Sequence, residues 1–268
     1  MRILLTNDDS INSPGILVLA AALRKAGHRV FVVAPAADQS GVSHSITFLN
    51  GPRKLAFAGE DTWSCEGTPV DCVIVALLGG LPEMCRSLQD TPPDLIISGI
   101  NRGANLGTDL AYSGTAAAAR QGAICGIPSL ALSLYEGASE GEYSEKIAWN
   151  WGMAAAFAVE RLDEMMAYWK PHSFINVNIP NQQEKPFKIV HAFPSFRYYN
   201  DSIDIYQAPD GSRYCFANAG RISAKPELGS DWNVVIERNA SLSEIYLYPV
   251  LLESVKRGEG NSGGKPGQ

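Results

Sequence analysis

The sequence predicts an α/β fold with one mainly parallel sheet and helices on both of its faces. Short apolar runs of strand length alternate with longer segments whose apolar residues recur at helical spacing. A strand, a helix and a second strand in succession predict parallel pairing with right-handed crossovers. After residue 185 the helical segments give way to short strands with turn signals, so a smaller β-rich extension is expected there.

The first unit consists of a strand at 2–6, a helix at 13–27 and a strand at 29–35. A serine of the capping type and a proline open this helix, and a glycine follows it, as expected at helix ends. The same alternation continues to residue 180, with helices expected at 68–80, 113–126 and 142–169 and strands at 94–99, 127–135 and 173–180.

The C-terminal part carries short strand-like runs at 188–193, 203–217 and 244–252. The Pro-Asp-Gly sequence at 209–211 marks a hairpin turn. The chain is therefore expected to have three parts. These are a catalytic core at 1–184, a β-hairpin extension at 185–256 that returns to the core and carries oligomer contacts, and a disordered Gly-rich tail at 257–268.

The composition is that of an ordinary globular protein. Of 268 residues, 46% are hydrophobic and 19% are charged, which is ample for a core. The net charge of −6 argues against long nucleic acid as a partner, because such proteins present a basic surface. A small anionic substrate is compatible with this charge, because backbone amides and a metal ion can bind it.

Export and membrane insertion are not predicted. The N-terminal segment is better interpreted as a strand than as a signal peptide, and the longest apolar run, residues 16–23, is too short to span a bilayer. The five cysteines are odd in number and lack the spacing of a metal site. We therefore expect a cytoplasmic protein with reduced thiols and no membrane contact.

Polar side chains gather in the loops that follow three predicted strands, at 7–10, 34–45 and 99–115. Ligands of doubly wound sheets bind at the carboxyl ends of the strands, so these three loops are expected to converge. They bring four side chains whose oxygens can coordinate a cation, Asp8, Asp9, Ser40 and Asn101.

Two carboxylates with neutral oxygens suit a hard divalent cation, Mg²⁺ or Mn²⁺, better than zinc. The helix expected from residue 113 adds an anion site, because its free amides are joined by the hydroxyls of Ser113 and Thr115. Gly41 and Gly114 let the backbone approach a ligand closely. A hard cation beside a helix N-terminus predicts a phosphate site, where the metal polarises a phosphoryl oxygen and acidifies a bound water.

Each of these features also has an ordinary structural interpretation. Adjacent aspartates after a strand often form only a cap or a turn, and a Ser-Gly-Thr sequence often only caps a helix. Asn101 could simply hold its own loop, and His44 is more often solvated or structural than catalytic. The convergence of three such loops favours a site. The chain lacks the motifs of P-loop NTPases, α/β-hydrolases and dinucleotide-binding proteins.

At these residues the sequence resembles the survival protein SurE family of metal-dependent nucleotidases. The matching stretches are ILLTNDDSINSPGI, VVAPAADQSGVSHSIT, GTPVDCV, DLIISGINRGANLG and YSGTAAAARQGAICGIPSLALS, which follow the family's order over most of residues 3–133. The chain departs from the family at Ser10, where glycine is usual, and over 230–252. If position 10 has a positive φ, Ser10 is strained where glycine would not be.

The resemblance implies a Rossmann-like three-layer fold, assembly into homodimers or homotetramers, and hydrolysis of nucleoside 5′- or 3′-monophosphates, with short polyphosphate as a further substrate. It places one Mg²⁺ or Mn²⁺ ion per subunit on the family's metal ligands, Asp8, Asp9, Ser40 and Asn101. The expected phosphate-binding residues are Gly41, Ser113, Gly114 and Thr115.

The expected mechanism is attack on phosphorus by a metal-bound water, with Asp8 and Asp9 as the catalytic carboxylates. The group that accepts the proton of this water is left open. Direct attack by Asp8 or Asp9 to form an aspartyl-phosphate ranks second. Two other classes of function remain as alternatives, a metal-dependent nucleotide-sugar glycosyltransferase and a non-enzymatic nucleotide sensor.

Overall fold

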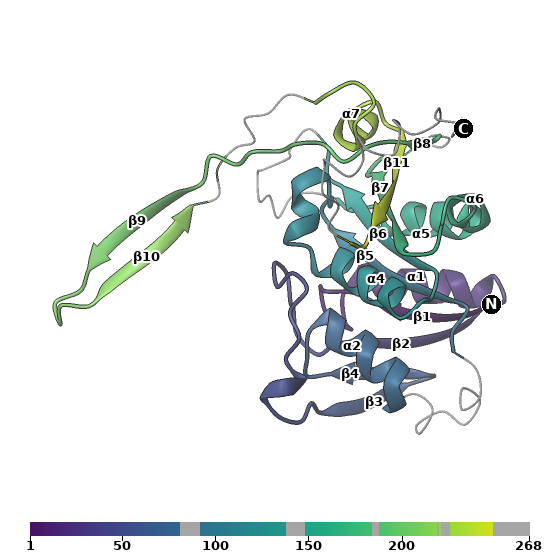
Figure 1. The fold of residues 1–268 in the computed structure, drawn as a ribbon, viewed down its shortest axis with the longest axis horizontal. Coiled ribbons are helices and arrows are strands. Elements are labelled where there is room, and N and C mark those ends of the chain that lie inside the picture. Colours follow the sequence, from purple (N-terminus) through teal and green to yellow (C-terminus); the bar gives the residue numbers. More distant parts are fainter. Residues whose placement is uncertain (81–91, 138–147, 184–187, 219, 221–225, 249–268) are drawn as a thin grey trace, which may run out of the picture.

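The chain is described by a computed structural model at residues 1–80, 92–137, 148–183, 188–218, 220 and 226–248. Within these ranges, nine strands form one sheet in the order β3–β4–β2–β1–β5–β6–β7–β11–β8 (Figure 1). The strands are β1 (Arg2–Thr6), β2 (Arg29–Pro35), β3 (Leu55–Gly59), β4 (Thr62–Cys65), β5 (Leu95–Arg102), β6 (Ser129–Tyr135), β7 (Ser173–Pro180), β8 (Ile189–His191) and β11 (Ala240–Tyr246).

The central strands of this sheet, from β4 to β7, all pair in parallel. The antiparallel pairs, β3 with β4 and β7 with β11, lie nearer the edges. In the middle of the sheet Leu4 lies opposite Phe31 on one side and Ile96 on the other, and all three side chains are fully buried. Strands that are apolar on both faces require cover on both faces, so the predicted parallel sheet is confirmed.

Helices supply that cover on the two faces of the sheet, which gives three layers (Figure 1). Ile3 and Leu5 of β1 belong to one apolar cluster, and Leu4 between them belongs to another. The first cluster includes residues of α1 (Pro14–Lys25), α5 (Trp151–Glu160) and α6 (Leu162–Met166). The second includes residues of α2 (Pro69–Val75) and α4 (Gly114–Ile124). The three-layer prediction is confirmed.

Most of the predicted helices begin close to the expected residue but are shorter than expected. The helix expected at 68–80 is α2 followed by a wider turn, η2 (Ala76–Gly80). Its predicted cap is confirmed, because the Thr68 side chain accepts from the Asp71 amide while the Asp71 carboxylate accepts from the Thr68 amide. In a capping box of this kind two otherwise unpaired amides are satisfied at once.

The single long helix expected at 142–169 is wrong. Residues 148–150 are not helical, α5 begins at Trp151, and the helix is interrupted at Arg161 before α6. The local reason for the start is Asn150, whose side-chain oxygen accepts the Met153 amide at 3.1 Å and so caps the helix there. Part of the expected range, 142–147, lies outside the described residues.

The C-terminal region divides between the main sheet and a projecting hairpin. Strands β8 and β11 join the sheet, whereas β9 (Ser202–Gln207) and β10 (Arg213–Asn218) form a separate two-stranded sheet that extends away from it (Figure 1). The predicted turn at 209–211 is confirmed, since the Ala208 amide donates to the Ser212 carbonyl at 2.8 Å. The boundary at residue 185 stays a prediction, and the tail at 257–268 lies outside the described residues.

Three further elements are absent from the sequence prediction. Strands β3 and β4 extend the sheet beyond β2, and helix α7 (Asp231–Ile236) packs near the carboxyl end of the sheet beside β11. Their short lengths, from four to six residues, give too few periods for a pattern to be recognised. In the part of the chain described, no helix combines the length and apolarity needed to cross a bilayer.

Candidate active site

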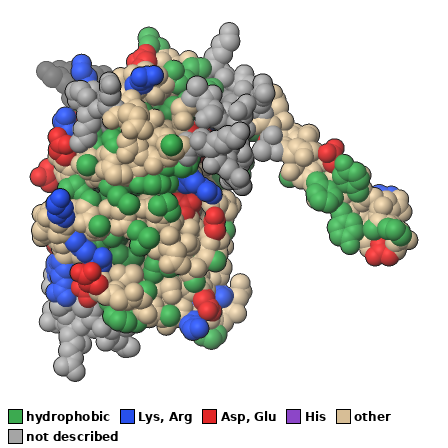
Figure 2. Space-filling model, turned by 180° about the vertical axis from the view of Figure 1, so that it is seen from behind, with side chains coloured by type: hydrophobic (Ala, Val, Ile, Leu, Met, Phe, Trp, Pro, Cys, Tyr) green, Lys and Arg blue, Asp and Glu red, His purple; other side chains and the backbone are tan. Residues whose placement is uncertain are grey.

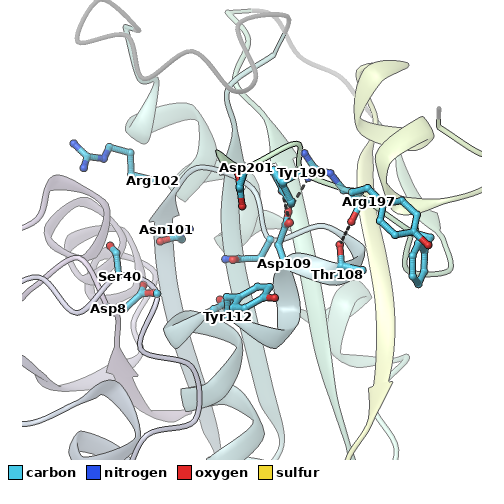
Figure 3. A pocket seen from close by; sticks show the side chains of 15 residues that line it. Asp8, Ser40, Asn101, Arg102, Thr108, Asp109, Tyr112, Arg197, Tyr199 and Asp201 are labelled. Carbon is cyan, nitrogen blue, oxygen red and sulfur yellow. Dashed lines mark hydrogen bonds and ion pairs between the residues drawn. The ribbon is translucent and has the colours of Figure 1, made fainter. Parts of the chain in front are cut away.

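A cavity of about 640 Å³ lies where β1 and β5 end, and it contains most of the predicted site (Figure 3). Five predicted site residues line it: Asp8, Ser40, Gly41, Asn101 and Ser113. The other three, Asp9, Gly114 and Thr115, do not line it but are close to its lining residues, as their contacts below show. The expected convergence of the three loops is therefore present.

Asp8 occupies the N-terminus of α4. The Thr115 amide donates to Asp8 Oδ2 at 3.1 Å, and the Thr115 hydroxyl donates to Asp8 Oδ1. A Cβ atom on Gly114 would lie 2.9 Å from the Asp8 side chain, so only glycine permits this close approach. The partial positive charge of the helix end and both donors favour the ionised carboxylate. Burial nevertheless dominates, and it raises the pKa of Asp8 above its ordinary value.

Asp9 lies beside Asp8 and receives the Arg102 backbone amide on Oδ2 at 3.0 Å. Burial, followed by the charge of Asp8, raises the pKa of Asp9 to about 7. No ion pair within the described ranges neutralises either carboxylate. The charge of Arg102 offsets this rise only in part. Two buried neighbouring carboxylates remain costly, and a bound divalent cation would relieve that cost.

The other two side chains at this end that could coordinate a cation, those of Ser40 and Asn101, are neutral. The Asn101 side-chain nitrogen donates to the Gly103 carbonyl at 2.9 Å, which fixes the amide and leaves its oxygen for a ligand. The Ser40 amide donates to Asp38 at 2.8 Å, and Gly41 follows with a φ of +76°, a conformation that glycine adopts without strain. Among the described residues no cluster of three His, Cys, Asp or Glu side chains exists. This set of two carboxylates, a hydroxyl and an amide fits magnesium or manganese rather than zinc.

Asn7, which the sequence analysis missed, holds the loop that carries the two aspartates. Its side-chain nitrogen donates to the Ser10 carbonyl and to the Ser13 hydroxyl, both at 2.7 Å. These bonds bend the chain sharply, and Ser10 has a φ of +87°. Ser10 therefore has the positive φ at which serine is strained and glycine would not be. An asparagine directly after a buried strand is a turn signal, and that signal could have identified Asn7.

The opposite end of the cavity was not predicted. It is lined by residues after β5 and by the extended segment before β9: Asn105, Thr108, Asp109, Tyr112, Phe196, Arg197, Tyr198, Tyr199 and Asp201. Figure 3 shows Arg197 and Tyr199 reaching toward Asp109. The dense aromatic and charged run at 196–201 is the signal that sequence reasoning overlooked.

Asp109 is the charged centre of this second end. Arg197 donates to Asp109 Oδ2 at 2.7 Å, and the Tyr199 hydroxyl donates to Oδ1. Arg197 is almost fully buried and also stacks over the Trp232 ring at 5.0 Å. Burial raises the pKa of Asp109, while Arg197 and the hydrogen bonds oppose that rise.

Buried asparagines support the cavity from beneath. The Asn105 carbonyl accepts from the side chains of Asn176 and Asn178, at 2.9 and 3.1 Å. The Asn105 amide donates in return to Asn178 at 2.7 Å, and its side chain donates to Ser133 at 2.7 Å. Amides buried on strands are tolerated when they are paired in this way. They fix the loop that leads from β5 into the cavity wall.

Comparison with known proteins agrees with this geometry. The model of the family described as "Survival protein SurE" matches residues 3–200. A protein of Geotalea daltonii named 5′-nucleotidase SurE is 36% identical over 249 residues, which cover 92% of this chain and 93% of the relative. The chain belongs to the SurE family.

Two further proteins of this family are close to the chain. A 5′-nucleotidase SurE of Rhizorhabdus wittichii is 37% identical over 235 residues, covering 86% of this chain and 87% of the relative. The crystal structure of the SurE protein from Aquifex aeolicus superimposes with a TM-score of 0.76 at 33% identity, covering 97% of this chain and 100% of that one. The Rossmann-like fold that the resemblance implied is therefore confirmed.

His44 does not line the cavity of this SurE family member. Its Nε2 atom lies 3.0 Å from the Gln121 side-chain oxygen of α4, and its Nδ1 atom is buried without a partner in the described residues. Burial lowers the pKa of His44. The ordinary structural interpretation of this histidine is favoured by these contacts.

Proposed function

We propose that the chain is a divalent-metal-dependent nucleotidase that hydrolyses nucleoside 5′-monophosphates, and also 3′-monophosphates, to nucleoside and phosphate. The observation that carries the proposal is the Asp8–Asp9 pair at the N-terminus of α4, at one end of a cavity with an aromatic opposite end. Family membership supports it, because the relatives compared are named 5′-nucleotidase. Short polyphosphate remains a further proposed substrate.

Asp8, Asp9, Ser40 and Asn101 are the proposed ligands of one Mg²⁺ or Mn²⁺ ion per subunit. A cation held there would supply positive charge to the phosphoryl oxygens and would lower the pKa of water. Asp8 and Asp9 orient the reacting groups. Both oxygens of Asp8 accept hydrogen bonds from Thr115, which disfavours Asp8 as a direct nucleophile and keeps water as the proposed one.

Phosphate is proposed to bind between this acidic pair and the start of α4. Ser113 lines the cavity, and its side-chain oxygen already accepts the Ala116 amide at 3.0 Å, which leaves its hydroxyl proton to donate to a phosphate oxygen. Gly41 offers backbone at the facing loop. The amide and the hydroxyl of Thr115 both donate to Asp8. We therefore propose that Thr115 orients the Asp8 carboxylate and does not contact phosphate directly.

The nucleoside is proposed to extend toward the aromatic end. Tyr112, Phe196 and Tyr198 line the cavity and are 67%, 60% and 58% exposed. Exposed rings in a cavity offer faces on which a base can stack. This orientation places the reacting phosphate near Asp8 and the base near the segment before β9 (Figure 3).

Release of phosphate from AMP tests the proposal and separates the three classes of function. Wild-type protein freed of metal is expected to be inactive and to recover activity with Mg²⁺ or Mn²⁺. A glycosyltransferase would need a nucleotide sugar instead, and a sensor would bind AMP without turnover. Absence of metal-dependent phosphate release from any nucleoside monophosphate would refute the proposal.

The projecting hairpin is proposed to assemble the chain into a homodimer or homotetramer. Its exposed apolar side chains are Ile203, Ile205, Tyr206, Tyr214 and Phe216, each more than half exposed (Figure 2). Such a surface on a two-stranded ribbon is unstable alone in water. Sedimentation of wild type against Ile205→Lys tests this: the variant is expected to shift toward monomer.

The described cysteines are free thiols, which fits the proposed cytoplasmic location.

A further inference from the structure

We propose that Asp231 is a positioning residue that clamps together the two loops forming the nucleoside end of the cavity. The inference rests on the proposed function only for the identity of what this end binds. Asp231 does not line the cavity and touches no reacting group. Its role is to hold the segments that do.

The carboxylate of Asp231 accepts three backbone amides. Oδ2 accepts from Gly107 at 2.8 Å, and Oδ1 accepts from Ser195 and from Trp232, both at 2.8 Å. The Asp231 side chain is fully buried. One side chain therefore bridges two segments that lie 88 residues apart in the sequence, at Gly107 and Ser195.

Both bridged segments lead directly into the cavity wall. Gly107 begins the turn η4 (Gly107–Ala111), which carries Thr108 and Asp109. Ser195 immediately precedes Phe196 and Arg197. A second bond repeats the tie, because the Thr108 hydroxyl donates to the Arg197 carbonyl at 2.7 Å.

The two segments also pack directly against each other. A Cβ atom on Gly107 would lie 1.8 Å from the Ser195 carbonyl oxygen, and Gly107 has a φ of +52°. The amides of both touching residues donate to the Asp231 carboxylate. Asp231 therefore joins the two segments without lining the cavity itself.

A buried charge at this position costs more than a neutral side chain unless it is well paired. Ser230 already caps α7, since its side-chain oxygen accepts the Asn233 amide at 3.2 Å. The helix therefore does not need Asp231 as its cap. Two of the three amides that the carboxylate accepts belong to the bridged loops, which points to positioning of the cavity wall as its function.

The test compares Asp231→Asn with the control Ser230→Ala. Asparagine keeps one acceptor oxygen but presents an amide to one of the facing N–H groups, so it releases one loop. Ser230→Ala weakens the same helix and leaves the clamp intact. Gly107→Ala is the third variant, because its methyl group forces the two loops apart without altering Asp231.

Kinetics with two substrates distinguish positioning from general instability. For Asp231→Asn and Gly107→Ala we expect KM for AMP to rise about tenfold, because small displacements of substrate-positioning groups have effects of this order or larger. The kcat for p-nitrophenyl phosphate, which has no nucleoside, is expected to stay near wild type. Ser230→Ala is expected to change neither value, even if its melting temperature falls.

Amide hydrogen exchange gives a readout independent of activity. Peptides covering Gly107 and Ser195 are expected to exchange faster in Asp231→Asn and at the wild-type rate in Ser230→Ala. Unchanged exchange in Asp231→Asn would overturn the clamp, as would an equal loss of activity on both substrates. A wild-type protein that hydrolyses no nucleoside monophosphate would refute the nucleotidase proposal instead, and the exchange measurement alone would then decide the clamp.

Discussion

The carboxylates at the two ends of the cavity have opposite surroundings. Asp8 and Asp9 lie side by side, and no ion pair in the described residues neutralises them. Asp109 at the other end is paired with Arg197 at 2.7 Å and bonded to Tyr199. A divalent cation would offset the cost of burying the acidic pair, whereas Asp109 already has its partners. This contrast supports our proposal that metal and phosphate bind at the first end and the nucleoside at the second.

Asp9→Asn should have the largest effect, because it removes one of the two charges that hold the cation. We expect metal-dependent AMP hydrolysis to fall by about 100-fold or more, given that even groups that only orient metal ligands are worth 10- to 100-fold. The metal-free variant should be as stable as wild type or more stable, since carboxylate repulsion is relieved. Phosphate release and thermal melting measure the two effects. Near-normal activity would remove the metal assignment.

Phe196→Ala should affect only the aromatic end. Loss of a stacking surface is worth roughly 1–3 kcal/mol per base, which corresponds to a rise of about 5- to 160-fold in KM for AMP. Turnover of p-nitrophenyl phosphate should be unchanged. Equal effects on both substrates would show that the two ends do not work separately.

Asn101→Ala should weaken the metal end without unfolding the protein. The amide is one of four proposed ligands and carries no charge, so metal affinity should fall by about tenfold or more, at least as much as for groups that only orient metal ligands. Titration of activity with Mg²⁺, together with calorimetry, separates the outcomes. If melting collapses while the remaining folded enzyme responds normally to metal, Asn101 is a structural residue.

The pH dependence of stability should reveal the cost of burying Asp9 beside Asp8. The folded pKa of Asp9 is about 7, above its ordinary value of 3.8, so its contribution is fully present below about pH 4 and is lost as pH rises through 7. Metal-free protein should therefore melt at lower temperature at pH 8 than at pH 5. Added Mg²⁺ should recover stability at pH 8. A melting temperature independent of pH without metal would contradict the unpaired state of this end.

Ser10→Gly should have the smallest effect. Serine at a φ of +87° carries strain of roughly 1 kcal/mol that glycine avoids. The variant is expected to melt at a slightly higher temperature, with a small change in activity if Asp9 is re-aimed. A clear drop in melting temperature would show that the Asn7 bonds already compensate for the backbone conformation.

The metal end could be predicted from sequence for a physical reason. Asp8, Ser40 and Asn101 each lie where a strand of the parallel sheet ends or just beyond it, and parallel strands bring their carboxyl ends to one edge. The role of Thr115 was less accessible, because its bonds to Asp8 depend on the close approach that Gly114 permits.

The aromatic end was not predictable by the same reasoning. Phe196 and Arg197 belong to no strand or helix, and they reach the cavity only because β8 and β11 return to the main sheet. Arg197 is paired with Asp109, 88 residues away, and the neighbouring Ser195 is bonded to Asp231, 36 residues away. Contacts between irregular segments at such separations leave no periodic signal, so only tertiary structure shows them.

The sheet order has a consequence for how the protein is made. Strand β8 precedes β11 in the chain but lies outside it, and within the described strands β8 pairs with β11 alone. During synthesis, β7 must therefore expose its edge until Ala240–Tyr246 has emerged from the ribosome, and β8 has no strand to join before then. The acidic pocket can form early, whereas the opposite wall of the cavity is completed only after nearly the whole chain is available.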